Sequence, residues 1–161
     1  MVICAGESLI DFVPQQTGDR PLYQPVAGGS PFNCAVAAAR LGADVAFLGA
    51  VSSDFFGDQI MARLTENGVC QEMITRVAHP TTLAFVKKES DGAARYAFYT
   101  NGSADRAFSK EMVPGSLPQD ALLQIGSISL IPDPESSAIL GLAEREREAV
   151  ELGGSVRAAG V

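Results

Sequence analysis

Residues 28–35 read Gly-Gly-Ser-Pro-Phe-Asn-Cys-Ala and lead directly into an alanine-rich stretch that we expect to be helical over residues 30–41. Glycines have no Cβ, so backbone N–H groups there approach a polar ligand closely. The first N–H groups of the following helix have no intrahelical partner and point at the same place. Ser30 is predicted as the N-cap, Pro31 suits the first helical position, and Gly42 ends the helix. The stretch therefore predicts a small-ligand site.

The flanking sequence alternates between strand and helix patterns. Val2 to Ile10 is predicted as one buried strand ending at Asp11, residues 20–26 as an extended segment, and Val45 to Val51 as a parallel strand. Apolar residues at helical spacing predict a second helix over residues 57–67, closed by a glycine. This alternation indicates an α/β fold with a doubly wound, mostly parallel sheet.

The pattern changes after residue 80. Residues 81–88 and 94–100 are two β-rich runs separated by a turn-forming cluster, and they predict a hairpin that stands apart from the main sheet. Residues 105–118 are expected to be a loop with a short helix, 121–130 a further buried strand, and 135–149 a helix rich in Glu and Arg. Residues 150–161 show no apolar periodicity that predicts a strand.

Composition sets outer bounds on function. The chain has 161 residues and 47% hydrophobic content, which suit one globular domain. A net charge of −7 without a basic run argues against nucleic acid as a partner. The apolar runs are shorter than the ~20 residues that span a bilayer, and the start lacks a signal-peptide pattern, so we expect no membrane association and a cytoplasmic location. Cys4, Cys34 and Cys70 are expected to be reduced thiols that serve as small core residues.

Several motifs in order resemble one family over about residues 1–140. Gly-Glu-x-x-x-Asp-x-x-Pro at residues 6–14, the glycine pair at 28–29 and Gly-Ala-Val-Ser-Ser-Asp-Phe-Phe-Gly-Asp at 49–58 resemble the amino-terminal signature of the PfkB (ribokinase-like) carbohydrate kinases, most like the fructokinases. The resemblance implies a ribokinase-like domain half over residues 1–149, with β lid strands at about 12–26 and 81–100, and a divergent tail at 150–161. The lid would cover the sugar, and in some members it also forms a dimer interface.

Sugar contacts are predicted for particular residues, with the role of Asp11 implied by the resemblance. Asp11 would accept hydrogen bonds from two sugar hydroxyls, because a carboxylate offers two acceptor oxygens; a solvated turn aspartate is the alternative. Gly28, Gly29 and Asn33 would bring backbone and a side-chain amide to the sugar, although a glycine pair can simply form a tight turn. Tyr99 and Asn101 lie on one side of a strand end, where a ring covers a sugar and an amide bonds a hydroxyl; ordinary strand packing is the alternative.

Other polar residues receive no role in the site. Arg95 is interpreted as an exposed strand charge, and His79 has no Ser or Cys nucleophile context. Asp54, Asp58 and Asp105 lack paired metal-ligand spacing. The resemblance makes the first two structural residues, with Gly57 forming the turn. A dinucleotide-binding domain is excluded because no G-x-G-x-x-G follows the first strand.

The catalytic half of the family has no counterpart in the sequence. The resemblance implies ATP and Mg²⁺ as cofactors, but the D-T-x-G-A-G-D motif and a Walker-type loop are both absent. We therefore expect the sugar-binding half of a fructokinase-like enzyme, inactive alone and truncated, with a shifted reading frame as the hypothesis for the tail. The alternative is a non-catalytic sugar-binding or interaction module completed by a separate chain. A truncated sheet would leave residues 121–130 as an apolar edge prone to self-association, with the lid as a second route.

Overall fold

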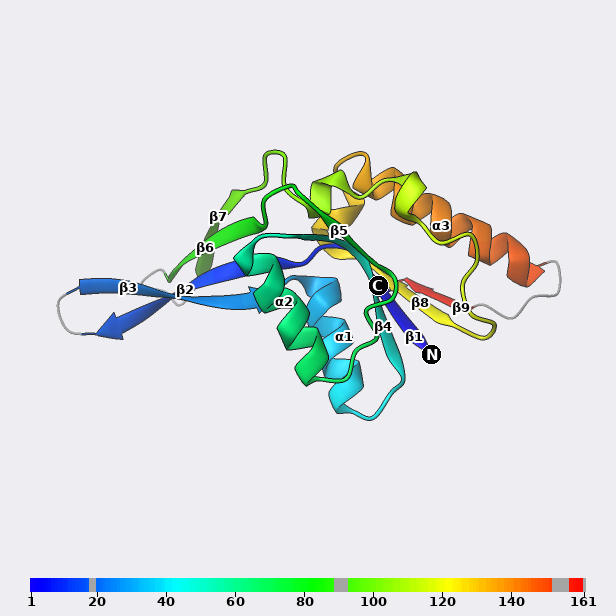
Figure 1. Cartoon of the computed structure of the whole chain (residues 1–161), viewed down its shortest axis with the longest axis horizontal. Helices are drawn as coiled ribbons and strands as arrows, with labels where there is room; N and C mark the ends of the chain where they lie inside the picture. The colour runs from blue at the N-terminus through cyan, green and yellow to red at the C-terminus, as the bar shows by residue number, and fades with distance from the viewer. Residues whose placement is uncertain (18–19, 89–92, 152–156, 161) are drawn as a thin grey trace.

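A computed structural model describes residues 1–17, 20–88, 93–151 and 157–160, which form two sheets and three helices (Figure 1). The main sheet has the strand order β5-β4-β1-β8-β9, and all its pairings are parallel. Its strands are β1 (Val2–Ala5), β4 (Val45–Ser52), β5 (Ile74–Val77), β8 (Leu122–Ile125) and β9 (Arg157–Gly160). This confirms the α/β class and the parallel sheet.

Helices cover both faces of the main sheet. Helices α1 (Ser30–Arg40) and α2 (Phe55–Glu66) lie on one face, and α3 (Glu135–Glu151) lies on the other (Figure 1). Every residue of β4 is buried. Its Phe47 packs with the α1 and α2 side chains, whereas its Leu48 joins the cluster that includes Ile139 of α3. Alternate residues of one strand thus supply two cores, which explains its continuous apolar sequence.

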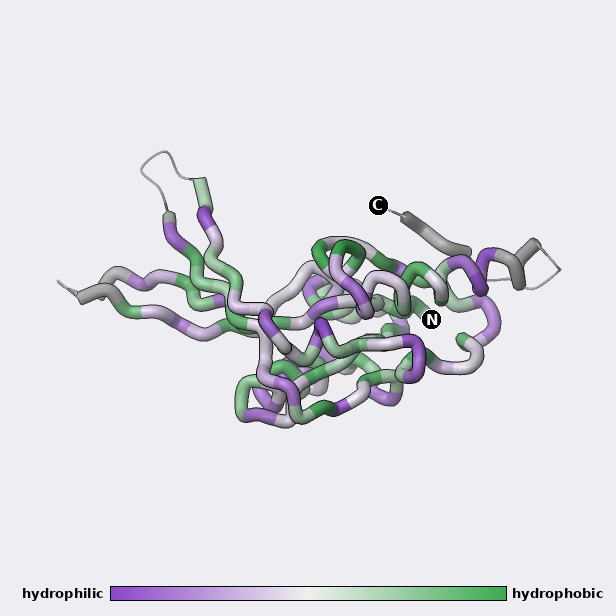
Figure 2. The backbone as a smooth tube through the Cα atoms, turned by 90° about the horizontal axis from the view of Figure 1, so that it is seen from above, coloured by the Kyte–Doolittle hydropathy of each residue, from purple (hydrophilic) through white to green (hydrophobic). Residues whose placement is uncertain are grey.

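The second sheet is the lid, with strand order β3-β2-β6-β7. Its strands are β2 (Leu9–Thr17), β3 (Arg20–Gly28), β6 (Thr82–Lys88) and β7 (Ala94–Tyr99). Two antiparallel hairpins, β2–β3 and β6–β7, are joined by parallel pairing of β2 with β6. Both hairpins project away from the body that holds the helices (Figure 2). The predicted hairpin over 81–100 and its separation from the main sheet are confirmed.

The prediction of one strand from Val2 to Ile10 is wrong. The run divides into β1 and β2, which belong to different sheets, so Asp11 lies within β2 and not at the end of a main-sheet strand. Gly6, with φ +145°, breaks the run, and a Cβ there would lie 2.6 Å from Pro31 and from Ser129. Residues 6–8 read Gly-Glu-Ser and separate two buried apolar segments, which the sequence pattern treated as one strand.

Two helix starts also differ from the predictions. Gly29, not Ser30, is the N-cap of α1, and its φ of +110° favours glycine. Helix α2 begins at Phe55, two residues earlier than predicted, because the Asp54 side chain accepts a hydrogen bond from the Gly57 N–H at 2.7 Å. Gly57 is inside the helix and does not form a turn. A Cβ there would lie 1.8 Å from the Ser52 carbonyl oxygen, so glycine permits the close approach of α2 to β4.

The carboxyl-terminal part needs three corrections. The predicted strand over 121–130 shortens to the four residues of β8, and Ser127–Leu130 forms the 3₁₀ helix η3. Residues 157–160 form β9, although the sequence showed no strand pattern there. Strand β9 pairs with β8 in parallel, so β8 is not an edge strand. The prediction that the chain self-associates through an exposed apolar edge at β8 is therefore wrong. Short 3₁₀ helices at Asp105–Ala107 (η1) and Lys110–Met112 (η2) agree with the predicted loop.

No helix among the described residues is both long enough and apolar enough to cross a membrane.

Candidate functional site

A pocket of about 520 Å³ opens where the lid meets the amino end of α1. Its lining comes from five parts of the chain: the β1–β2 connection, the start of β2, the first turns of α1, strand β7 and helix η3. The lining residues are Glu7, Leu9, Asp11, Gly29, Ser30, Asn33, Cys34, Ala37, Tyr96, Phe98, Ser127 and Ile128. The pocket therefore joins three of the residues predicted from sequence, and Gly28 adjoins them.

Asp11 lies at the base of the lid, where β2 pairs with β3. Its carboxylate lies against Gly28, since a Cβ on that glycine would be 2.4 Å from Asp11 Oδ2. Burial raises the pKa of the Asp11 carboxyl above its ordinary value of 3.8. Among the described residues its side chain has no hydrogen-bond partner, so the carboxylate is available to donors that enter the pocket.

The start of α1 supplies the opposite wall. The Asn33 N–H donates to the Gly29 carbonyl at 2.8 Å, which is the first hydrogen bond of the helix. The Asn33 side chain is exposed, lines the pocket and has no hydrogen-bond partner among the described residues. Its amide offers both a donor and an acceptor to a polyol.

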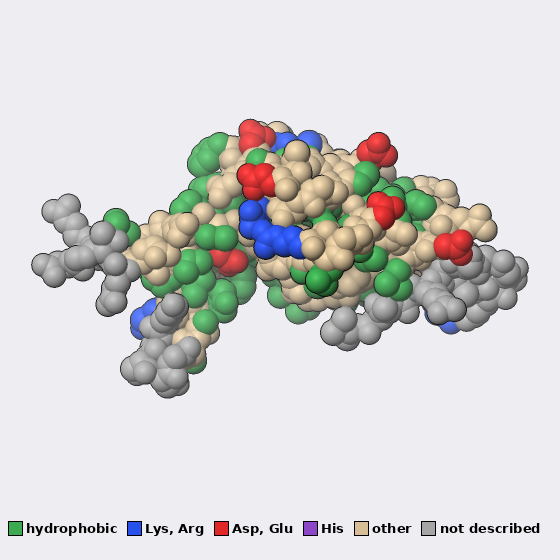
Figure 3. Space-filling view, turned by 90° about the horizontal axis from the view of Figure 1, so that it is seen from below, with side chains coloured by type: hydrophobic (Ala, Val, Ile, Leu, Met, Phe, Trp, Pro, Cys, Tyr) green, Lys and Arg blue, Asp and Glu red, His purple; other side chains and the backbone are tan. Residues whose placement is uncertain are grey.

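Aromatic side chains of β7 close the lid side of the pocket. Tyr96 and Phe98 both line it, and their rings stack with centroids 5.7 Å apart. They are about half exposed, at 53% and 47%. Figure 3 shows hydrophobic side chains gathered on the lid where it meets the body. A sugar ring stacks well on such a surface because its C–H face is apolar.

Tyr99 and Asn101 are not brought into this pocket. Alternation along β7 sends Tyr99 to the other face, where its ring packs edge-on against Phe85 with centroids 5.6 Å apart. Tyr99 and Asn101 instead line a separate hollow with Thr81. Tyr96 and Phe98 were not predicted, because alternation shows which residues share a face of a strand but not which face meets the ligand.

Asp54 and Asp105 form hydrogen bonds within the protein, and these bonds give both residues a structural role. Asp54 caps α2 and also accepts hydrogen bonds from the N–H and hydroxyl of Thr81. The buried Asp105 accepts from the hydroxyls of Thr82 and Ser103, which lie at the two ends of the β6–β7 hairpin. Both aspartates therefore hold the base of the lid in place.

The remaining polar candidates lie outside the pocket, except one thiol. His79 Nδ1 lies 3.0 Å from the Gly102 carbonyl oxygen, and Asp58 forms an exposed ion pair with Arg76. Cys4 is buried, as expected, and burial raises its pKa to about 12. Cys34 is exposed on the pocket wall and is not the core residue that we predicted.

The described residues contain no group of three or more His, Cys, Asp or Glu side chains that could hold a metal ion.

A larger groove of about 750 Å³ lies between α1, α2 and β3. Of the residues predicted for sugar binding, its lining contains only Asn33. Its polar rim residues, among them Arg40 and Arg63, are partnered by Asn67 and Glu66. The smaller pocket is the better candidate because polar side chains without partners converge there.

A doubly wound α/β body with a small β lid beside a polar pocket defines the ribokinase-like class of sugar-kinase folds. The chain belongs to the pfkB family of carbohydrate kinases, whose family profile matches residues 1–148.

Individual relatives agree with this assignment. The chain is 39% identical to the probable chloroplastic fructokinase-6 of Arabidopsis thaliana over 154 residues, which cover 92% of this chain and 40% of that protein. It is 36% identical to a fructokinase of Rhizobium leguminosarum bv. trifolii, covering 91% of this chain and 45% of that one. The crystal structure of fructokinase with bound ATP from Xylella fastidiosa superposes with a TM-score of 0.80 at 32% identity, covering 98% of this chain and 50% of that chain. The chain thus spans about half the length of these relatives.

Proposed function

We propose that the chain forms the sugar-binding half of an ATP-dependent carbohydrate kinase of the fructokinase type, with fructose or a similar sugar as substrate. One observation carries the proposal: Asp11 and Asn33, two polar side chains without hydrogen-bond partners in the described chain, meet in one pocket beside backbone-exposing glycines. The comparisons do not favour the alternative of a non-catalytic module.

The arrangement suits a polyol. The Asp11 carboxylate accepts from two hydroxyls, the Asn33 amide donates or accepts, and the Tyr96 and Phe98 rings cover the apolar face of the sugar. Tyr99 and Asn101, which line a neighbouring hollow, remain predicted ligand contacts.

Phosphoryl transfer needs more than this pocket. It requires a general base for the sugar hydroxyl, donors for the transferred phosphoryl group and Mg²⁺ with ATP. The described residues offer a place to bind and orient the sugar but no group of three or more His, Cys, Asp or Glu side chains that could hold a metal ion. We therefore expect the chain to bind sugar without phosphorylating it. Turnover in a coupled ATP assay with the highly purified chain would contradict this.

Calorimetry with fructose tests the proposal. Asp11→Ala should weaken binding by about 1–3 kcal/mol, because sugar hydroxyls would lose their half-buried acceptor. Asp44→Ala is the matched control, since Asp44 is exposed and lies outside the pocket lining. Equal fructose affinity for the wild type and Asp11→Ala would place the site elsewhere.

We also propose that the chain self-associates through its lid. The lid exposes large hydrophobic side chains, namely Leu22, Tyr23, Val26, Tyr96, Phe98 and Tyr99. Such a surface favours association with a second copy. Sedimentation velocity should show a dimer that Tyr23→Ser with Tyr99→Ser converts to a monomer. A wild type that is monomeric at high micromolar concentration would refute this route.

A further inference from the structure

Two of the pocket walls come from distant parts of the chain. Gly29 and Ser30 form one wall at the start of α1, and Ser127 and Ile128 of η3 form the other. The width of the pocket therefore depends on whatever holds these two backbone segments together.

A single buried side chain contacts both walls. Glu7, which is 1% exposed, accepts a hydrogen bond from the Ser30 N–H through Oε1 at 3.0 Å. Its other oxygen, Oε2, accepts from the Ser129 N–H at 3.3 Å. Glu7 itself lines the pocket between them. One carboxyl group thus bridges the segments at a fixed separation.

Neither wall has a local alternative to this acceptor. The N-cap of α1 is Gly29, which has no side chain to cap the first N–H groups of the helix. A Cβ at position 29 would lie 2.7 Å from the Glu7 carbonyl oxygen, so a conventional Ser or Asp cap does not fit. Helix η3 likewise follows a glycine, Gly126, and has no side-chain cap. Glu7 acts as a long-range cap for both.

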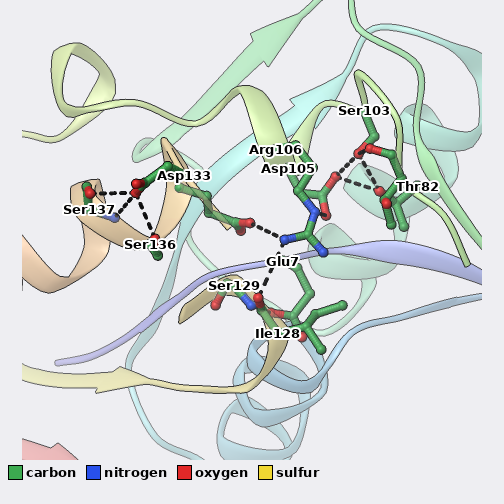
Figure 4. Close-up of polar contacts among 12 residues, drawn as sticks. Glu7, Thr82, Ser103, Asp105, Arg106, Ile128, Ser129, Asp133, Ser136 and Ser137 are labelled. Carbon is green, nitrogen blue, oxygen red and sulfur yellow. Dashed lines mark hydrogen bonds and ion pairs between the residues drawn. The ribbon is translucent and has the colours of Figure 1, made fainter. Parts of the chain in front are cut away.

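The second wall is also held from behind by Arg106. Its Nη1 lies 3.5 Å from the Ile128 carbonyl oxygen and 3.5 Å from Glu135 Oε2, and Figure 4 shows the guanidinium group between Asp105 and the η3 segment. Asp105 in turn accepts hydrogen bonds from Thr82 and Ser103 at the lid base. The η3 wall is therefore held by Glu7 on one side and by Arg106 on the other.

We infer that Glu7 is a positioning residue of the sugar pocket, which sets the distance between the α1 wall and the η3 wall by accepting one backbone N–H from each. The inference rests on the proposed sugar-binding function, because the pocket it shapes is the one assigned to the sugar. Glu7 acts through Ser30 and Ser129 and need not touch the ligand.

The substitution Glu7→Gln tests this role with little change in shape. A glutamine side chain has one acceptor oxygen, and its NH₂ end would face the other N–H, so one of the two bridging hydrogen bonds must be lost. Glu146→Gln is the matched control, because Glu146 is also buried, at 5% exposure, but pairs with Arg145 on α3. Amide exchange rates of Ser30 and Ser129 and fructose affinity are measured on all three proteins by NMR and calorimetry.

We expect Glu7→Gln to speed exchange of the Ser30 or the Ser129 amide and to raise the Kd for fructose about tenfold, with Glu146→Gln matching the wild type. Unchanged exchange at both amides would overturn the inference, and so would altered exchange with unchanged fructose affinity. If Glu7→Gln does not fold, the wild type is tested by NMR scalar couplings across the hydrogen bonds from the Ser30 and Ser129 amides to the Glu7 carboxyl carbon. Absence of these couplings would overturn the inference. A wild type that shows the couplings but binds no fructose refutes the proposed function and the role in sugar binding, and leaves Glu7 as a bridge between the walls.

Discussion

Replacement of Asp54 by alanine should remove both the cap of α2 and an anchor of the lid. The Asp54 carboxylate accepts hydrogen bonds from the Gly57 N–H at 2.7 Å, the Thr81 N–H at 2.9 Å and the Thr81 hydroxyl at 2.7 Å. Loss of an aspartate cap costs about 1 kcal/mol. Thr81 is only 6% exposed, so its N–H without an acceptor costs about 1–3 kcal/mol more. We expect a loss of about 2–4 kcal/mol in the free energy of unfolding.

Urea unfolding followed by circular dichroism measures this loss as a lower midpoint at constant slope. Asp58→Ala, which removes an exposed ion pair from the next turn, should cost less than about 1 kcal/mol. Burial raises the pKa of Asp54, but the hydrogen bonds from Gly57 and Thr81 outweigh this effect and hold the pKa below 3.8. The contribution of Asp54 is therefore present above pH 3.8 and lost as pH falls through the lowered value. A loss no greater than that of Asp58→Ala would refute this reasoning.

Two further predictions concern the same body of the protein. Burial and the nearby Asp105 raise the pKa of Glu135 to about 9, so the folded state holds a proton that the unfolded state releases above pH 4.5. Stability should therefore fall between pH 4.5 and 9, and Glu135→Gln should flatten this fall in a series of thermal unfolding curves; parallel curves for the two proteins would contradict it. Gly57→Ala should lower the melting temperature strongly, because its Cβ would lie 1.8 Å from the Ser52 oxygen, whereas Gly115→Ala meets nothing within 4 Å. Similar melting temperatures for these two variants would show that the close approach of α2 to β4 does not matter.

Local patterns in the sequence predicted much of the fold. The apolar run of β4, the helical spacing of α1 and the turn-separated β-rich runs of β6 and β7 each carry their own signal. Errors arose where an element depends on distant partners. Gly6 divides the first apolar run because Pro31 and Ser129 approach it closely, and β9 forms by pairing with β8 although its own sequence has no strand pattern. Neither partner is visible in a local window.

The site shows the same division. Asp11, Gly28, Gly29 and Asn33 were selected from motifs, and the structure places them around one pocket edge. Tyr96 and Phe98 were not predicted as site residues. Which face of β7 meets the pocket is set by its pairing with β6 and by how the lid meets the body. The bridging role of Glu7 was not predicted, because its hydrogen-bond partners lie 23 and 122 residues away along the chain. Such long-range contacts follow from the tertiary fold alone.

The most direct test of the central claim is a fructose titration of the ¹⁵N-labelled chain, followed residue by residue by NMR. We predict that the backbone amides of Asp11, Gly28, Gly29 and Asn33 shift together with one saturation curve. The chemical shifts of amides in the groove between α1 and α2, such as those of Gln59 and Arg63, should not change. Saturating shifts confined to that groove, or no shifts at all, would contradict the assignment of the lid pocket as a sugar site.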